Sequence, residues 1–275
     1  MTPKYEFHAE DVIRQGRIRR ENLEKLKSWC IAQNLPAMSD EQLILFLLYR
    51  YDNVEKAKNV VIGYFKSQKN APELFYDRNM DAENLTQTIE ITMAVMPVRT
   101  CTNDVVFFGK LKDTSASNFS FEHTVKLCTM LAEIPLCKDP PDGVVGVADL
   151  KGCSLWHLFK IKLSTVQKLL SYLEEGYPCK IKKVHVLNTV GFIDKIIWML
   201  QPFLKKGFLK LFEFHQPDMD MNDFFEKFLA ADCCPEDYGG TLPSLESLSA
   251  ASYQEMRNLQ TFYKDEEEQI KSFRL

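Results

Sequence analysis

The chain has 275 residues, of which 45% are hydrophobic and 26% charged, with a net charge of −4 and a pI near 5.8. This composition is typical of a globular protein with a substantial core, divided into one large domain and a smaller one. The acidic balance excludes a general nucleic-acid binder, which needs a basic excess to displace phosphate counterions.

Neither a signal sequence nor a membrane span is expected from the apolar pattern. The N-terminus lacks the apolar run of a secretory signal, and no stretch approaches the ~18 consecutive apolar residues of a spanning helix. We therefore expect a cytoplasmic protein. The 8 cysteines show no Cys-x-x-Cys pair and no zinc spacing, so we expect reduced thiols and neither a metal nor another cofactor.

The first part of the chain, from Glu10 to about Phe75, has the apolar spacing of amphipathic helices. One predicted helix contains RRENLEKLKSWCIAQ and ends before Pro36. Another begins at Ser39, whose hydroxyl is placed to cap a helix three residues before Gln42. A third helix is predicted in NVEKAKNVVIGYFKSQ.

From about Glu90 the pattern changes to short apolar runs that alternate with amphipathic helices. Continuous apolar runs are typical of strands covered on both faces, and their alternation with helices indicates a mainly parallel sheet. We therefore predict an α/β fold: an all-helical N-terminal part, then a mainly parallel mixed sheet flanked by helices. The predicted strands are 105–111, 144–150, 184–190 and 209–215, each with a helix before the next strand or after the last.

The predicted division of the chain is a helical subdomain over 1–80, a larger α/β domain over 81–250 and a C-terminal segment over 251–275. The last segment contains the acidic run KDEEEQIK (264–271), which we interpret as a solvated helix or a frayed end.

Motifs for an active site are weak. DLKGCS (149–154) has one glycine where a dinucleotide-binding loop needs three, and there is no Gly-x-Ser-x-Gly or His-Glu-x-x-His pattern. Cys153 or Cys179 with His157 or His185 could form a nucleophile and base, but no orienting context accompanies them. We therefore predict that the protein is not an enzyme and has no catalytic residues.

Five blocks of the sequence carry a family resemblance. They are DEQLILFLLYRYDNVEKAKNVVIGYFKSQKNAPELF (40–75), GVVGVADLKG (143–152), YPCKIKKVHVLNTVGF (177–192), QPFL (201–204) and PEDYGG (235–240). In order and spacing they resemble the CRAL-TRIO family of lipophilic-ligand carriers over nearly the whole chain. The last block resembles the family's closing signature, whose glycines let the backbone adopt conformations that a side chain would forbid.

The resemblance implies a hydrophobic pocket closed by a gate helix, and FIDKIIWMLQPFLKKGF (192–208) corresponds to that gate. Its apolar residues cover more than one helix face, which suits a lid that is sometimes exposed. The alternative is a helix buried in the core. The gate residues predicted to contact the ligand are Ile193, Ile196, Ile197, Leu200, Phe203 and Leu204.

Strand alternation predicts further ligand-contacting residues. Val144, Gly146 and Ala148 share one face of their strand and are small enough to leave space above it. From neighbouring elements we add Leu169, Tyr172, Leu173, Val184 and Val186. Ser154, Tyr172 or a buried thiol are the candidates for orienting the polar end of a ligand.

A basic patch for lipid headgroups is also implied by the resemblance. Its members are Arg50, Lys180, Lys182, Lys205 and Lys206. The chain departs from the family pattern where Leu45 and Leu48 replace arginines, which puts the polar role of that helix in question.

The leading prediction is therefore a carrier that moves a hydrophobic small molecule or phospholipid between membranes, touching the membrane transiently and binding no nucleic acid. The alternative is a phosphoinositide-sensing or protein-interaction module without transfer activity.

Overall fold

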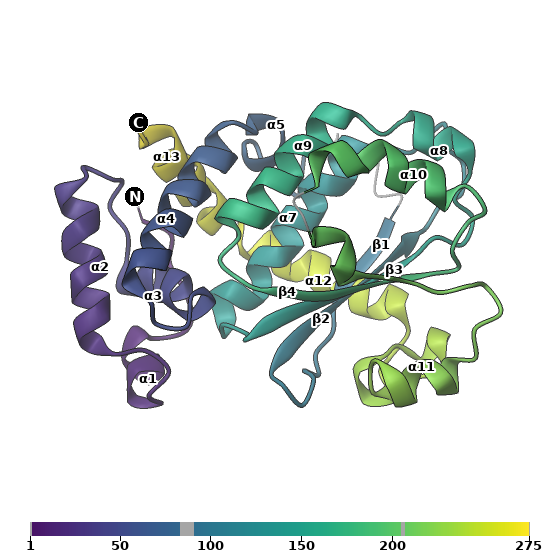
Figure 1. Ribbon diagram of the computed structural model, residues 1–275, viewed down its shortest axis with the longest axis horizontal. Coiled ribbons are helices and arrows are strands. Elements are labelled where there is room, and N and C mark those ends of the chain that lie inside the picture. Colours follow the sequence, from purple (N-terminus) through teal and green to yellow (C-terminus); the bar gives the residue numbers. More distant parts are fainter. Residues whose placement is uncertain (1, 83–90, 205–206, 275) are drawn as a thin grey trace.

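The computed structural model describes residues 2–82, 91–204 and 207–274. Figure 1 shows a helical N-terminal part beside a sheet that has helices above and below it. The predicted α/β class, with N-terminal helices followed by a mixed sheet flanked by helices, is confirmed.

The N-terminal part consists of short helices joined by tight turns. The cap predicted at Ser39 is present, because its Oγ accepts a hydrogen bond from the Gln42 backbone N–H at 3.2 Å. The helices are α1 (Ala9–Arg14), α2 (Arg20–Ala32), α3 (Asp40–Tyr49), α4 (Val54–Lys69) and α5 (Pro72–Phe75).

The sheet has five strands in the order β1-β2-β3-β4-β5. β1 pairs with β2 in the antiparallel direction, and the other pairs are parallel. The antiparallel strand was not among the predicted ones. The strands are β1 (Ile91–Val95), β2 (Asp104–Leu111), β3 (Gly143–Asp149), β4 (Ile181–Leu187) and β5 (Phe212–Phe214).

Helices cover both faces of the sheet (Figure 1). On one face lie α7 (Phe121–Lys138), α8 (Leu155–Phe159), α9 (Leu163–Ser171) with the π-helix η1 (Tyr172–Gly176), and α10 (Ile193–Leu200). On the other lies α11 (Met221–Lys227). Single-turn 3₁₀ segments are η2 (Gln201–Phe203), η3 (Phe208–Leu211), η4 (Ala231–Cys233) and η5 (Glu236–Tyr238).

The free edge of β1 is covered by α12 (Leu245–Asn258). The Ser252 hydroxyl accepts a hydrogen bond from the Val95 N–H, and the Tyr253 hydroxyl donates to the Ile91 carbonyl. These side chains satisfy backbone groups that an edge strand otherwise leaves to solvent or to another chain.

The helical part joins the sheet domain through a close backbone approach. A Cβ added to Gly63 of α4 would lie 2.2 Å from the Glu175 carbonyl oxygen, and one added to Gly176 would lie 2.5 Å from the Ser67 Oγ. Only glycine fits at such separations. This contact fixes η1, and with it α9, against α4.

The C-terminal segment is a helix, as one of the two predictions for KDEEEQIK (264–271) stated, but its inner side is packed against the protein and not solvated. α13 (Gln260–Ser272) is a helix whose inner side is buried, including Glu266, Gln269 and Ile270. Glu266 forms a fully buried ion pair with Arg78, and Gln269 exchanges hydrogen bonds with Gln42 at 2.8 and 2.9 Å. The acidic run suggested a solvated helix because its buried residues Glu266 and Gln269 are polar, and their partners, Arg78 and Gln42, lie far away in the sequence.

Candidate functional site

A cavity of about 370 Å³ lies between the sheet and α7. Its volume falls in the usual range of small-molecule pockets, and its walls are almost entirely apolar. Strands β1 to β4, α7 and the loop after β3 contribute the walls. The side chains that matter below are Met93, Phe107, Gly109, Phe119, Cys128, Gly146, Ala148, Cys153 and Val184.

The floor of the cavity exists because neighbouring strands carry small residues side by side. Gly109 of β2 pairs with Ala148 of β3, and Gly146 of β3 pairs with Val184 of β4. A Cβ added to Gly146 would stand 3.6 Å from Val184, and one added to Gly109 would stand 4.0 Å from Met93. These are ordinary contact distances, so the missing side chains leave open volume.

The opposite wall supplies thiols. Cys128 of α7 lines the cavity, to which its accessible surface is turned although protein surrounds it, and Cys153 lines the cavity from the loop after β3. Burial raises the pKa of each thiol to about 11, so both stay protonated near neutral pH. Their polarity is weak, which keeps this wall compatible with a hydrocarbon ligand.

Charged residues at the cavity have their partners elsewhere. Lys110 lies with its Nζ 3.6 Å from Asp237 Oδ1, and Asp149 accepts a hydrogen bond from the Tyr238 hydroxyl at 2.9 Å. Both residues alternate with floor residues along their strands, so their side chains leave toward the other face of the sheet. The cavity is therefore close to neutral.

The closing motif PEDYGG stabilises this region of the sheet. Besides the Tyr238 contact with β3, Asp237 accepts a hydrogen bond from the Leu245 N–H at the start of α12. Gly239 has φ = 82°, and a Cβ at Gly240 would lie 2.0 Å from the Cys234 carbonyl oxygen. One glycine thus provides a left-handed conformation and the other a close approach.

The predicted pocket residues divide into two groups. Gly146, Ala148 and Val184 line the cavity, whereas Val144 and Val186 are buried outside its lining. Leu169, Tyr172 and Leu173 were predicted to contact the ligand, but they do not line this cavity. They pack into the core next to the helical part. Tyr172 shows this best: its ring lies 4.7 Å from that of Phe75, and its hydroxyl donates to Glu133.

The predicted gate segment forms α10 and η2, and Ile193, Ile196, Ile197, Leu200, Phe203 and Leu204 are all half-buried. No residue of α10 is fully buried. None of these six residues is among the described residues that line the 370 Å³ cavity. Trp198 of the same helix is 77% exposed. The core-helix alternative is thus wrong for α10, and the gate role stays a prediction.

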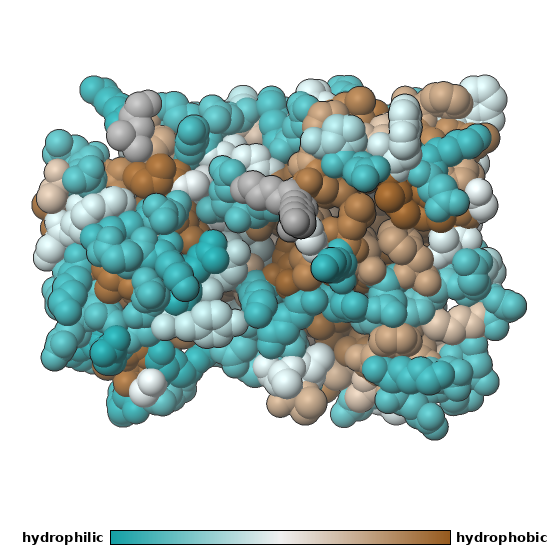
Figure 2. Space-filling model, viewed as in Figure 1, coloured by the Kyte–Doolittle hydropathy of each residue, from teal (hydrophilic) through white to brown (hydrophobic). Residues whose placement is uncertain are grey.

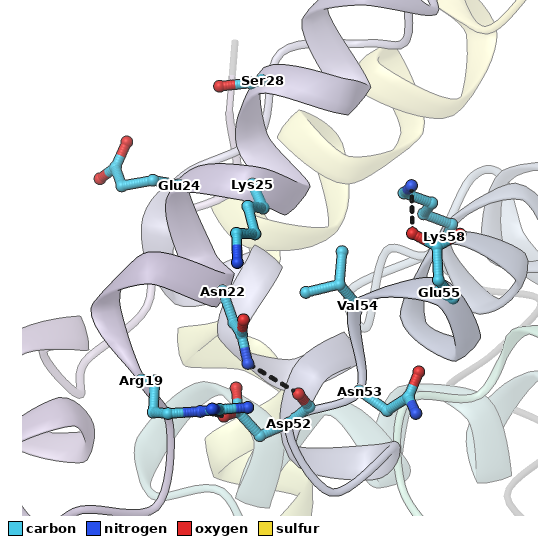
Figure 3. Close-up of a pocket in the computed structure, with 10 residues that line it drawn as sticks. All are labelled: Arg19, Asn22, Glu24, Lys25, Ser28, Asp52, Asn53, Val54, Glu55 and Lys58. Atoms are coloured by element: carbon cyan, nitrogen blue, oxygen red, sulfur yellow. Dashed lines mark hydrogen bonds and ion pairs between the residues drawn. The ribbon is translucent and has the colours of Figure 1, made fainter.

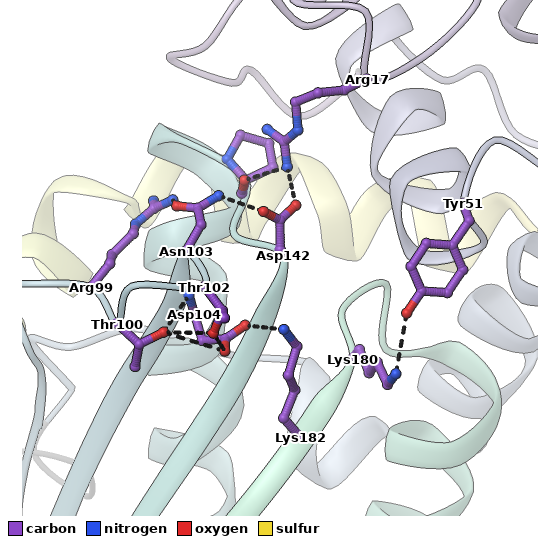
Figure 4. A network of polar contacts seen from close by, with 11 residues as sticks. Arg17, Tyr51, Arg99, Thr100, Thr102, Asn103, Asp104, Asp142, Lys180 and Lys182 are labelled. Carbon is purple, nitrogen blue, oxygen red and sulfur yellow. Dashed lines mark hydrogen bonds and ion pairs between the residues drawn. The ribbon is translucent and has the colours of Figure 1, made fainter. Parts of the chain in front are cut away.

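Two members of the predicted basic patch lie at a cleft of about 260 Å³ beside the helical part (Figure 4). Lys180 and Lys182 line this cleft together with Arg17. Lys182 Nζ is 2.7 Å from Asp104, Arg17 is 2.7 Å from Asp142, and Lys180 donates to the Tyr51 hydroxyl.

The other predicted members of the basic patch are placed differently or not described. Arg50 is outside the lining of the cleft, and its guanidinium lies 4.1 Å from the centre of the Tyr49 ring. Lys205 and Lys206 lie outside the described residues.

A second open groove, of about 730 Å³, runs between α2 and α4 (Figure 3). Charged and polar side chains of both signs line it, among them Arg19, Asp52 and Lys58. With Val54 as its apolar lining residue, it lacks the character of a lipid site.

Features of an enzyme are weak in the structure as well. Burial raises the pKa of Cys179 to about 12, which disfavours the nucleophilic thiolate. His185 is hydrogen-bonded to His215 and packed against Phe224, on the sheet face opposite the cavity floor. Within the described ranges, no group of three or more His, Cys, Asp or Glu residues is arranged to hold a metal ion.

Sequence reasoning missed the contributions of β1, β2 and α7 to the cavity. Gly109 carried the clearest signal, since it is a glycine inside the otherwise apolar strand VVFFGKL. Cys128 of α7 and Phe119, which lies just before that helix, carried no such signal, because their approach to the cavity depends on how this segment crosses the sheet.

Helices in front of a mixed sheet, with an apolar cavity on one sheet face, define a class of α/β proteins suited to holding a hydrophobic molecule. Residues 91–240 match the CRAL/TRIO domain family, and residues 17–85 match the Pinta-like UBA domain family. The first match covers more than half of the chain, so the protein belongs to the CRAL/TRIO family.

Curated relatives are about one quarter identical to this chain over the residues that align. The Alpha-tocopherol transfer protein-like of Mus musculus is 24% identical over 216 residues, 78% of this chain and 62% of the relative. Clavesin-1 of Xenopus laevis is 24% identical over 102 residues, 37% of this chain and 30% of the relative. The chain thus spans 62% of the length of the first of these relatives.

Among solved structures, the crystal structure of Sfh5 aligns with a TM-score of 0.47 at 14% identity, covering 75% of this chain and 74% of that one. No helix within the described residues is both long and apolar enough to cross a bilayer.

Proposed function

We propose that the protein is a non-enzymatic carrier that binds a hydrophobic small molecule or phospholipid in the cavity above the sheet and moves it between membranes. The observation that carries this proposal is the cavity floor formed by Gly109, Gly146 and Ala148. These small residues leave an open volume on a sheet face where larger side chains would otherwise pack. Burial of a lipid there contributes ~25 cal/mol for each Å² of apolar surface removed from water.

The family assignment supports the same function. The name of the tocopherol transfer protein-like relatives states a lipid-transfer role for those proteins, and we extend it to this chain as part of the proposal. The work of such a carrier is to extract, shield and return its ligand, and it requires no reaction. We place this activity in the cytoplasm.

Exposed apolar side chains support transient contact with a membrane. Figure 2 shows apolar surface gathered over the half of the molecule that contains α8, α9 and α10, while the side of α2 is mostly hydrophilic. Large exposed apolar residues of a monomer are typical of interaction surfaces. Those in this region are Leu155 (42%), Trp156 (71%), Phe159 (75%), Leu163 (41%) and Trp198 (77%).

The gate is the next element of the proposal. α10 is apolar on more than one side and has no fully buried residue, so little packing opposes its movement. We assign it the role of a lid that leaves the protein surface at the membrane. Ile197→Asp with Leu200→Asp should abolish ligand retention, because charges at these half-buried positions oppose the closed position; unchanged retention would contradict a gate.

The carrier function is tested by a vesicle transfer assay. Donor vesicles carry labelled retinol, α-tocopherol and phosphatidylcholine, and mass spectrometry follows each lipid into acceptor vesicles. The protein should accelerate the arrival of one of these lipids. Trp156→Ser with Trp198→Ser should slow the transfer, whereas Ile31→Ser, at a residue 70% exposed on α2, should not. No acceleration of any lipid would contradict the proposal.

The cleft of Arg17, Lys180 and Lys182 favours a second candidate, a phosphoinositide-sensing module without transfer activity. Its three cations lie where the helical part meets the sheet, each directed to its own partner (Figure 4), and Asp104 and Asp142 offset part of their charge. Lys180→Ala with Lys182→Ala should then weaken binding to phosphoinositide-containing vesicles and leave cavity occupancy unchanged. Equal binding to neutral and anionic vesicles would remove this candidate.

A further inference from the structure

One cation at the cleft beside the helical part has a neutral partner. Lys180 Nζ donates a hydrogen bond to the Tyr51 hydroxyl at 3.1 Å and lies 5.8 Å from the centre of the same ring, and no carboxylate of the described residues forms an ion pair with it. By contrast, Lys182 and Arg17 at this cleft each lie 2.7 Å from a carboxylate oxygen. An ammonium group makes stronger hydrogen bonds to anions than to neutral groups. A negative charge at the Tyr51 oxygen would therefore be stabilised.

Tyr51 is also the exposed tyrosine of the chain. All 10 tyrosines lie within the described ranges, and the others are half-buried or buried, whereas Tyr51 is 77% exposed. It follows α3 in the turn before α4, where Tyr51 and Asp52 have left-handed backbones with φ = 52° and 58°. This turn presents the Tyr51 ring to solvent, so an enzyme can reach its hydroxyl.

Tyrosine hydroxyls elsewhere are committed to the interior of the protein. The Tyr172 hydroxyl donates to the buried Glu133 carboxylate, and the Tyr263 hydroxyl donates to the Met130 carbonyl. A charged group attached to either oxygen would have to be buried without a matching cation, which is strongly unfavourable. Exposure and local charge thus both single out Tyr51.

A phosphoryl group has the charge and the acceptors that suit Lys180. On a tyrosine it carries about −1.5 to −2 charge at pH 7 and offers three acceptor oxygens. Asp104 and Asp142 balance the other two cations of the cleft, so among the described residues the charge of Lys180 is left unbalanced there. Figure 4 shows the Tyr51 side chain reaching from the helical part toward Lys180 beside the sheet. A phosphate on Tyr51 would therefore add an ion pair across this junction.

We propose that Tyr51 is a phosphorylation site of a protein tyrosine kinase and that its phosphate binds Lys180. In the reaction the Tyr51 oxygen attacks the γ-phosphorus of a nucleoside triphosphate, the bond from that phosphorus to the nucleoside diphosphate breaks, and the phenol proton passes to the catalytic base of the kinase. The product holds the helical part to the sheet more strongly and neutralises a cation that would otherwise attract anionic lipids. This inference is independent of the proposed carrier function.

The first test asks whether the folded protein accepts phosphate at this residue. The whole chain is incubated with ATP and a tyrosine kinase domain of broad sequence tolerance, and mass spectrometry of its peptides locates the phosphate. Tyr51 should take up close to one phosphate for each chain, and Tyr51→Phe should take up none. Tyr76→Phe, at a half-buried tyrosine outside the cleft, should match the wild type. Absence of phosphate from Tyr51, or phosphate mainly on other tyrosines, would overturn the site.

The second test asks whether the phosphate contacts Lys180. Phosphotyrosine is introduced at position 51 during translation, so that no kinase is needed, and ³¹P NMR follows the phosphate as the pH is changed. The second pKa of a phosphate ester is near ~6, and a neighbouring ammonium lowers it by stabilising the dianion. The lowering should disappear in Lys180→Ala and persist in Lys25→Ala, at an exposed lysine of α2. Equal phosphate pKa values in these two variants would overturn the contact with Lys180.

Discussion

At the scale of single residues, absent side chains define the site. Gly109 and Gly146 sit in the middle of strands, where glycine is usually a disadvantage, and each leaves space at the floor of the cavity. In the proposed carrier, the ligand and not the protein would therefore complete the packing at this floor.

Gly146→Leu should fill this space. The new side chain adds four carbon atoms where ligand atoms would otherwise lie, and at ~0.8 kcal/mol for each buried CH₂ the ligand loses about 3 kcal/mol. Lipid affinity should thus fall more than ~10-fold, with little change in melting temperature, and Gly146→Ala should show a smaller loss. Unaltered lipid affinity in the leucine variant, measured by dialysis, would place the ligand elsewhere.

The alternation of side chains along a strand predicts which residues share a face, but not which part of that face borders the cavity. The period of a strand correctly grouped Gly146 with Ala148 on one face. It could not exclude Val144 on the same face, because the helical part covers that end of β3. Likewise Tyr172 belongs to a π-helix whose contacts with α4 depend on tertiary packing.

At the scale of elements, the junction between α4 and η1 depends on two glycines that meet across it. Gly63→Ala would place its methyl group 2.2 Å from the Glu175 carbonyl oxygen, so backbone would have to shift. We expect the free energy of unfolding to fall by about 1–3 kcal/mol in denaturant titrations. Gly191→Ala is the control, since a Cβ there meets nothing within 4 Å; equal stability of the two variants would contradict the close junction.

A second element contact, between β4, β5 and α11, depends on a pair of histidines. His185 Nδ1 lies 3.0 Å from His215 Nε2, and Phe224 of α11 packs on both rings. Burial and then the neighbouring imidazole lower the pKa of His185 to about 4, with Glu213 opposing and Lys183 adding to the shift. This depressed pKa makes the contact sensitive to acid.

The sign of the effect follows from the unfolded state, where a histidine has a pKa near ~6.5. Below that pH the histidine is protonated in the unfolded chain, whereas His185 in the folded protein stays neutral until about pH 4. The contribution of His185 to the free energy of unfolding is therefore fully present above ~6.5 and is lost as the pH falls toward about 4. His185→Phe should lose less stability than wild type over this interval in thermal melts at successive pH values. Parallel losses in the two proteins would show that the pair does not titrate as described.

At the scale of the whole molecule, alternation of strands and helices was enough to predict the class, while long-range polar contacts were not predictable. The antiparallel β1 escaped notice because its edge is completed by Ser252 and Tyr253 from a helix far along the chain. The C-terminal helix was misread for the same reason, since Arg78 neutralises Glu266 from a distant segment.

The exposed aromatic residues also bear on how the proposed carrier would meet a membrane. α8 and α10, which carry the exposed Trp156 and Trp198, lie on the same face of the sheet as α7 (Figure 1), and α7 forms one wall of the cavity. In the proposed carrier, a membrane that receives these side chains would approach this face of the protein.

Mass spectrometry of the lipids bound to the purified protein, after incubation with a mixed lipid extract and extraction with organic solvent, tests the central claim most directly. The account predicts one stoichiometric lipid species that is lost in Gly146→Leu. A cavity that stays empty after the incubation would contradict it.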